Sequence, residues 1–362
     1  MYLVIVNVIV LSERSDMSKI GIVVLFVLAG ILIPAYMLIR TKLVRNGSIL
    51  KKEYSGSLKG LFAVYIALHH LALLSEPSSA ILLPLKNVGY LCVSFFFLMS
   101  GYGLAMGYSR NGLKDFIKKR IIKIYIPYFL SIVVIGFLYL AFMDGVKVSD
   151  IFIKALLMKT IDSDGILWYV FVQIIMYVFF WVSFKFVPAR NNNICMLMTL
   201  FILTCLYILY CKVTAANLWR YNTVLCFPLG VCISLYKEKV IELISCHYKK
   251  ILASMVCLFL FGFILVMLNK HSFVMSVLSS LMFACLTVLI SFRTEIHSKL
   301  LLFLGNISYE YYIFQLPIIR IVMKNIKTDY FYSIIIVLAT TVMAFFVHSI
   351  SEKISRVLLK ER

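Results

Sequence analysis

Residues 20–39 of the chain read IGIVVLFVLAGILIPAYMLI, twenty residues without a charged side chain. A run of about 20 apolar residues is long enough to cross the hydrocarbon core of a bilayer as an α-helix. The whole chain has the same character: of its 362 residues 62% are hydrophobic and 14% are charged, and the mean hydropathy is +0.98. An ordinary soluble domain is about half apolar and a quarter charged. The composition therefore excludes a soluble enzyme, a disulfide-built secreted domain and a disordered tail, and it indicates a polytopic membrane protein.

Eleven apolar runs follow one another along the chain, and they predict an all-α bundle of about eleven transmembrane helices. Two of these runs have only 16 residues, and both continue into mixed sequence. The predicted spans are 20–39, 60–75, 87–108, 124–143, 166–184, 192–211, 221–236, 251–268, 273–292, 300–319 and 330–351.

The basic residues predict the orientation of these spans. The chain has 36 Lys and Arg against 16 Asp and Glu, a net charge of +20. Every second connection, counted from the one after the first span, carries basic residues that total 24, and the remaining segments carry 12. Because Lys and Arg accumulate in cytoplasmic loops, we expect the N-terminus outside and the C-terminus in the cytoplasm. A nucleic-acid-binding protein would be polar as well as basic, so no nucleic-acid partner is expected.

The start of the chain leaves two interpretations open. Residues 1–11 are apolar but too short to cross a bilayer. No basic region precedes them, so a signal peptide is not expected. Translation could also start at Met17, and the apolar segment that follows would then serve as a signal anchor.

The nine cysteines are odd in number and scattered, with no CxxC pair and no histidine at ligand spacing. Free cysteine in apolar sequence behaves as a small hydrophobic residue. We therefore predict buried cysteines, with no disulfide framework and no metal site.

Ionisable side chains inside membrane spans are costly, and they are therefore candidates for function. Lys59 and His70 are eleven residues apart, about 20° past three full helical turns, so they share one face at a separation of about 16 Å. With Lys59 at the cytoplasmic boundary, His70 is expected near the middle of the membrane, at a depth similar to that of Glu310. A histidine that is oriented by a partner can act as a general base.

Structural roles for the same residues remain open. His69 and His70 point about 100° apart, so at most one of them faces a given site. A buried neutral histidine bonded to a neighbouring helix is common in membrane proteins. Glu310 is equally a candidate for a structural partner of a Lys or Arg.

The connection 109–123 (SRNGLKDFIKKRIIK) places six basic residues at helical spacing with apolar residues between them. One interpretation is topology together with contact to anionic lipid. The other is an electropositive mouth that holds the phosphates of a nucleotide-type donor.

Five motifs occur in order along the chain. They are Ser57-Leu58-Lys59-Gly60-Leu61 leading to His69-His70, Asn87 with 93–103 (VSFFFLMSGYG), 116–127 (FIKKRIIKIYIP), Leu167-Trp168-Tyr169, and 305–317 (GNISYEYYIFQLP). Together they resemble acyltransferase family 3, integral membrane acyltransferases that modify sugars and other surface acceptors. The family usually has Arg at the position of Lys59, a second Arg at Lys123, and His at Gln315. Lysine keeps the charge but loses bidentate geometry, and glutamine does not titrate.

The resemblance covers about residues 57–353. It implies three parts: an N-terminal helix with a basic connection at 1–56, a membrane acyltransferase domain at 57–353 and a basic cytoplasmic tail at 354–362. It also implies transfer of an acyl group, most often acetyl, from cytoplasmic acyl-CoA to a hydroxyl of a cell-surface glycan or its lipid-linked precursor. The expected location is the bacterial plasma membrane, among membrane lipids. The rival interpretations are a transporter or flippase of a glycan or lipid and a non-catalytic sensor or scaffold.

The resemblance also implies roles for particular residues. His70 accepts the proton of the acceptor hydroxyl or forms a transient acyl-imidazole. Ser100 lines the path of the pantetheine arm, or it serves only helix packing. The remaining assignments are Glu310 as a second catalytic residue that orients His70 or the sugar, Lys59, Arg120 and Lys123 on the donor's phosphates, and Tyr309, Gln315 and Trp168 on the substrate.

Overall fold

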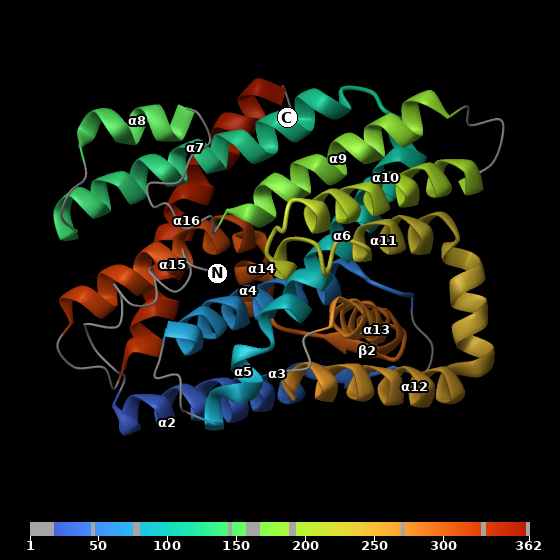
Figure 1. The fold of residues 1–362 in the computed structure, drawn as a ribbon, viewed down its shortest axis with the longest axis horizontal. Coiled ribbons are helices and arrows are strands. Elements are labelled where there is room, and N and C mark those ends of the chain that lie inside the picture. Colours follow the sequence, from blue (N-terminus) through green and yellow to red (C-terminus); the bar gives the residue numbers. More distant parts are fainter. Residues whose placement is uncertain are drawn as a thin grey trace.

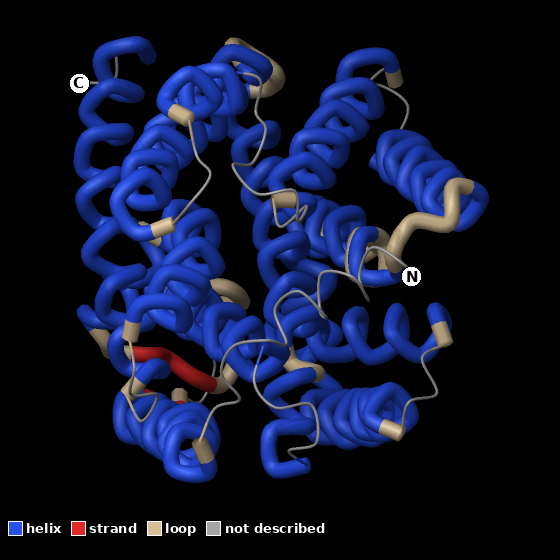
Figure 2. Tube along the Cα trace, turned by 60° about the vertical axis from the view of Figure 1, so that its left-hand side comes forward, coloured by secondary structure: helices blue, strands red, loops and turns tan. Residues whose placement is uncertain are grey.

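The computed structural model describes residues 18–44, 48–74, 80–143, 147–156, 167–187, 193–268, 272–326 and 331–359, and it is a bundle of helices (Figure 1). The all-α class is confirmed, since the regular structure of the described residues is helical apart from two strands of three residues each (Figure 2). The predictions made for residues 1–11 and Met17 lie outside the described residues.

The elements follow one another closely along the chain. The first helix is continuous from Lys19 to Arg40 and contains a π-helical turn. The elements are α2 (Lys19–Val27), η1 (Leu28–Leu32), α3 (Ile33–Arg40), β1 (Thr41–Leu43), α4 (Lys52–Leu74), η2 (Ala80–Leu82), α5 (Leu83–Lys86), α6 (Gly89–Asn111), α7 (Phe116–Phe142), α8 (Val148–Leu156), α9 (Trp168–Phe186), α10 (Asn193–Val213), η4 (Leu218–Arg220), α11 (Cys226–Leu235), α12 (Lys237–Met267), α13 (Phe273–Ser291), β2 (Thr294–Ile296), α14 (Lys299–Asn306), α15 (Ser308–Asn325) and α16 (Tyr332–Leu359).

Each of the eleven predicted spans overlaps a helix, and nine helices within the described residues are long and apolar enough to cross a membrane. The predicted span 221–236 contains only α11, whose 10 residues rise about 15 Å, half the thickness of the hydrocarbon core. The predicted span 300–319 is interrupted at Ile307, whose ψ of 8° separates α14 from α15. These two segments account for the difference between eleven predicted spans and nine long apolar helices.

The two strands bring distant connections together at one end of the bundle. β1 pairs antiparallel with β2, with Thr41 opposite Ile296. Beside this pair, Lys51 forms an ion pair with Glu295, and the Lys51 ammonium lowers the pKa of that carboxyl. Both strands lie in connections that the basic residues predict to be cytoplasmic. Their pairing puts these two connections at the same end of the bundle. Which membrane face this end occupies stays a prediction.

Glycines permit the closest helix contacts in the bundle. A Cβ built on Gly101 of α6 would lie 2.1 Å from the carbonyl oxygen of Phe227 in α11, and one on Gly230 of α11 would lie 2.0 Å from the carbonyl oxygen of Leu98. The backbones of α6 and α11 are therefore in direct contact, as small residues allow in membrane bundles. Gly103, in the same SGYG motif, has no atom within 4 Å of the corresponding position.

The cysteines follow the predicted burial only in part. Cys92, Cys211 and Cys226 are buried, but other cysteines, Cys195 and Cys257 among them, are exposed on the helices. The prediction of general burial is wrong because a membrane helix is apolar on its lipid-facing side as well as on its packed side. An apolar run therefore does not tell which of its residues face the protein interior.

Candidate functional site

Five residues that the sequence assigns to the donor or substrate line one cavity of about 240 Å³. These residues are Lys59 of α4, Ser100 of α6, Arg120 and Lys123 of α7, and Tyr309 of α15. Four helices contribute to this set, although the residues are separated by up to 250 positions in sequence. We call this space the basic cavity.

Close packing of α4 against α14 positions two walls of the basic cavity. A Cβ on Gly60 would lie 2.2 Å from the carbonyl oxygen of Leu301, and one on Gly305 would lie 2.0 Å from that of Gly56. Gly60 directly follows Lys59, and Gly305 comes four residues before Tyr309. The glycines of two motifs thus bring the first and last motifs of the chain to the same cavity.

Arg120 has the environment of an anion-binding residue. Its guanidinium carbon lies 5.7 Å from the ring centres of both Phe116 and Tyr177. Its Nε is buried and has no hydrogen-bond partner within the described part of the chain. Aromatic rings hold a guanidinium by cation–π attraction while its N–H groups remain able to bind a phosphate.

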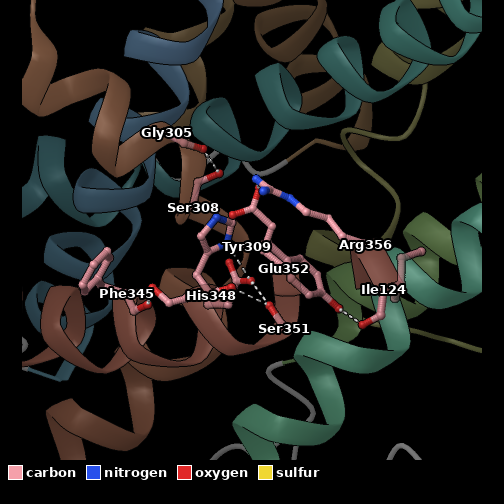
Figure 3. Close-up of polar contacts among 11 residues, drawn as sticks. Ile124, Gly305, Ser308, Tyr309, Phe345, His348, Ser351, Glu352 and Arg356 are labelled. Atoms are coloured by element: carbon pink, nitrogen blue, oxygen red, sulfur yellow. Dashed lines mark hydrogen bonds and ion pairs between the residues drawn. The ribbon is translucent and has the colours of Figure 1, made fainter. Parts of the chain in front are cut away.

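Tyr309 and Ser100 are held in the wall by neighbouring helices. The Tyr309 hydroxyl donates a hydrogen bond of 3.1 Å to the backbone oxygen of Ile124, directly after Lys123 on α7 (Figure 3). Ser100 lies within hydrogen-bonding reach of the side chain of Tyr169, which also lines the basic cavity. Tyr309 thus connects the start of α15 to the basic segment of α7.

A second cavity, of about 600 Å³, contains His70 and Trp168. We call it the histidine cavity. Trp168 lies 5.3 Å, between ring centres, from Trp219, which belongs to the connection between α10 and α11. Other residues that line this cavity are His69, Lys86, Asn87, Tyr90, Asn217, Asn222 and Thr223.

The two adjacent histidines have different surroundings. His69 Nδ1 lies 3.0 Å from the backbone oxygen of Leu85, and its ring occupies the space where a Cβ of Gly89 would be, at 2.3 Å. His69 therefore bonds α4 to α5 and packs against α6. His70 Nδ1 has no hydrogen-bond partner of good geometry among the described residues, although Gln315 lies beside it within reach of one.

Gln315 is completely buried, and both polar atoms of its side chain lack hydrogen-bond partners in the described structure. It is not part of the lining of either cavity. The structure thus places Gln315 behind His70 and outside both cavities, whereas the sequence assigned Gln315 to the substrate. Contact between Gln315 and a bound substrate stays a prediction.

Glu310 is directed away from both cavities, which corrects the expectation that it orients His70. Its Oε1 lies 3.0 Å from His348 Nδ1 and accepts a hydrogen bond of 3.3 Å from Ser351 Oγ. His348 and Ser351 both belong to α16 (Figure 3). Glu310 lies about 200° around α15 from the cavity-lining Tyr312, so the two residues occupy opposite faces. The alternative role for Glu310, as a structural partner of a Lys or Arg, is met in the structure by a histidine, His348.

His70 lies near the end of α4, and its depth in a membrane stays a prediction. The predicted span began at residue 60, but α4 begins at Lys52, so Lys59 lies about 10 Å inside the helix and His70 lies four residues before its end at Leu74. The histidine cavity is lined by the connection 217–219 and by Lys86, which precede α11 and α6. The donor residues and His70 therefore line two cavities placed along the bundle axis.

The structure also supplies residues that the sequence did not single out. Trp219 and Asn222 lie in a short connection without a motif, so no sequence signal points to them. Gln173, by contrast, stands out in the sequence as a polar residue within an apolar span, and it lines the basic cavity. In the residues that the structure describes, no group of three or more His, Cys, Asp or Glu side chains could hold a metal ion.

The comparisons with known proteins agree with the order of the motifs. A family model described as an acyltransferase domain, that of acyltransferase family 3, matches residues 53–350. This match extends from the first turn of α4 into α16 and leaves the helix Lys19–Arg40 outside. No curated protein and no solved structure gives a significant match to the chain. The match covers most of the chain and all five motifs, and the protein therefore belongs to acyltransferase family 3.

Proposed function

We propose that the protein transfers an acetyl group from acetyl-CoA to a hydroxyl of a cell-surface glycan or its lipid-linked precursor. The observation that carries the proposal is the pair of adjoining cavities. One holds three basic side chains, and the other holds a histidine with a tryptophan pair. The basic cavity suits a donor with several phosphates, because charge-assisted hydrogen bonds to phosphate are strong.

The histidine cavity suits a saccharide acceptor. Trp168 and Trp219 offer flat apolar surfaces, and Asn87, Asn217 and Asn222 offer amide groups for hydroxyls. Sites for small molecules commonly combine aromatic walls with a few polar groups that orient the ligand. We place the acceptor there, at the end of the bundle opposite the β1–β2 pair.

The chemistry of transfer needs one base and a bound thioester. His70 accepts the proton of the acceptor hydroxyl as its oxygen attacks the thioester carbonyl carbon. The carbon–sulfur bond breaks, the new carbon–oxygen ester bond forms, and the coenzyme A thiolate takes the proton from His70. The products are the acetyl ester and free coenzyme A.

The proposal is tested in membranes from cells with and without the gene. Acetyl-CoA labelled in the acetyl group is added, and label in alkali-labile ester on the glycolipid fraction is measured together with released thiol. We expect both products only where the gene is present. Movement of glycolipid across vesicles without any acyl donor, and without thiol release, would instead establish a transporter or flippase. Mass spectrometry of the cell-surface glycans identifies the acceptor.

The basic cavity yields a prediction for donor binding. We expect the double variant Arg120→Ala/Lys123→Ala to bind coenzyme A ten- to a hundredfold more weakly, since each lost bond to a charged group is worth about 1.5–3 kcal/mol, less where solvent screens it. Titration calorimetry of the purified protein measures the affinity. The matched control is Lys114→Ala/Lys118→Ala, which removes two exposed basic residues of the same connection that do not line the cavity. Equal weakening by both double variants would show a general effect of charge and would contradict the assignment.

A further inference from the structure

Three residues belong to the lining of both cavities: Ile66 of α4, Val93 of α6 and Tyr312 of α15. All three are buried, with exposed fractions of 3%, 7% and 8%. They come from three different helices, and together they form the boundary between the cavities. We call this group the septum.

The three helices present their functional residues in the same order along the bundle axis. On α4, Ile66 lies about 10 Å beyond Lys59 and about 6 Å before His70, and the three side chains share one face within about 40°. The antiparallel α6 carries Ser100 in the basic cavity, then Val93 in the septum. On α4 the septum residue therefore lies between a donor residue and His70, and on α6 the septum residue follows the donor residue along the axis.

α15 repeats this order. Tyr309 lines the basic cavity, Tyr312 lines both cavities, and Gln315, three residues further, lies beside His70. The ring of Tyr169, which lines the basic cavity, packs against the ring of Tyr312, with 5.5 Å between the ring centres. Tyr312 thus forms a supported wall of the septum.

We propose that the septum selects the acyl group by size. This inference rests on the proposed function, in which the donor occupies the basic cavity and His70 serves the acceptor. The thioester carbon must then reach the histidine cavity past Ile66, Val93 and Tyr312, while the phosphates stay with Arg120 and Lys123. A short acyl group passes between these side chains, and a longer one meets them.

The magnitude of this selection follows from the cost of a methylene group. A hydrophobic site distinguishes substrates that differ by one methylene by about 10–200-fold. Acetyl and butyryl differ by two methylenes, so we expect the wild-type protein to transfer butyryl at least tenfold less efficiently than acetyl. Widening the septum at two side chains should raise the butyryl-to-acetyl ratio by at least tenfold.

The experiment measures the ester formed in membranes from labelled acetyl-, propionyl-, butyryl- and hexanoyl-CoA. The widened variant is Ile66→Ala/Val93→Ala. The control variant, Val64→Ala/Leu91→Ala, removes the same number of side-chain carbons from buried positions on α4 and just inside α6 that line neither cavity. The ratio is taken for each variant in the same membranes, so the amount of folded protein cancels.

A second variant narrows the septum and keeps the test decisive if the widened variant fails to fold. Val93→Leu is expected to lower the propionyl-to-acetyl ratio about tenfold, with the affinity for coenzyme A unchanged because the phosphates bind elsewhere. A wild-type protein that transfers hexanoyl as well as acetyl would overturn the proposal, as would equal ratios in the wild-type, widened and narrowed proteins. So would a ratio shift in the control variant equal to that in the widened one. Absence of transfer from all four donors in the wild type would instead refute the proposed function.

Discussion

Replacement of His70 by alanine is expected to lower the rate of acetyl transfer about a thousandfold. General acid–base catalysis by a positioned side chain typically contributes about 10²–10⁴-fold, and alanine has no group that can take the acceptor's proton. The affinity for coenzyme A should stay unchanged, because His70 does not line the basic cavity. The measurements are label transfer in membranes and calorimetric titration of coenzyme A on the purified variant.

The control for this prediction is His297→Ala, which removes an exposed histidine from the connection between β2 and α14. We expect wild-type transfer from this variant. Transfer by His70→Ala at the rate of His297→Ala would exclude His70 as the base. A His70→Ala protein that also fails to bind coenzyme A would indicate misfolding. The transfer rate of His70→Gln, which keeps the size and polarity of the side chain, would then decide whether His70 is the base.

Replacement of Gly101 by alanine is expected to destabilise the folded protein by about 3 kcal/mol, toward the upper end of the usual cost of overpacking. The added Cβ would lie 2.1 Å from the carbonyl oxygen of Phe227, which belongs to the backbone and cannot turn aside. The helices α6 and α11 must therefore separate. Since α6 also carries Ser100, which lines the basic cavity, we expect weaker coenzyme A binding as well as a lower melting temperature in detergent.

The same helix provides the control for Gly101→Ala. Gly103 has no atom within 4 Å of a built Cβ, so Gly103→Ala should leave the stability unchanged or raise it by about 0.5 kcal/mol through its better helix propensity. Gly230→Ala, on the other side of the contact, should reproduce the effect of Gly101→Ala. A melting temperature of Gly101→Ala equal to that of Gly103→Ala would show that the two helices are not in backbone contact.

Some features of the site were predictable because the groups concerned are recognisable from their local sequence. Arg120 and Lys123 stand in a basic connection, and Lys59 shares a helix face with His70, so their spacing made them candidates, and the resemblance to the family implied their role at the donor's phosphates. The SGYG motif indicated a close helix approach, and the structure shows this approach at Gly101. The motif alone does not show that the space beside Gly103 is open, because that depends on where α11 crosses α6.

Other features were not predictable because they depend on how whole helices are placed. α4 begins at Lys52, eight residues before the predicted span, and no local signal marked that start. Glu310 is a residue type that often serves in catalysis, but the rotation of α15 about its axis turns the Glu310 side chain toward His348 on α16. A sequence shows which residues share one helix face, whereas the neighbour that this face meets is decided by packing.

The sequence by itself determined the membrane-embedded all-α class, the order of the helices and the chemical groups that lie within them. It could do so because the length of an apolar run and the charge of its flanks are local properties that the bilayer selects directly. Only the tertiary structure decided that the basic residues and His70 occupy two cavities that meet at Ile66, Val93 and Tyr312. The physical reason is that each cavity is the space left between side chains of several helices, and that space depends on crossings set by glycine contacts far from it in sequence.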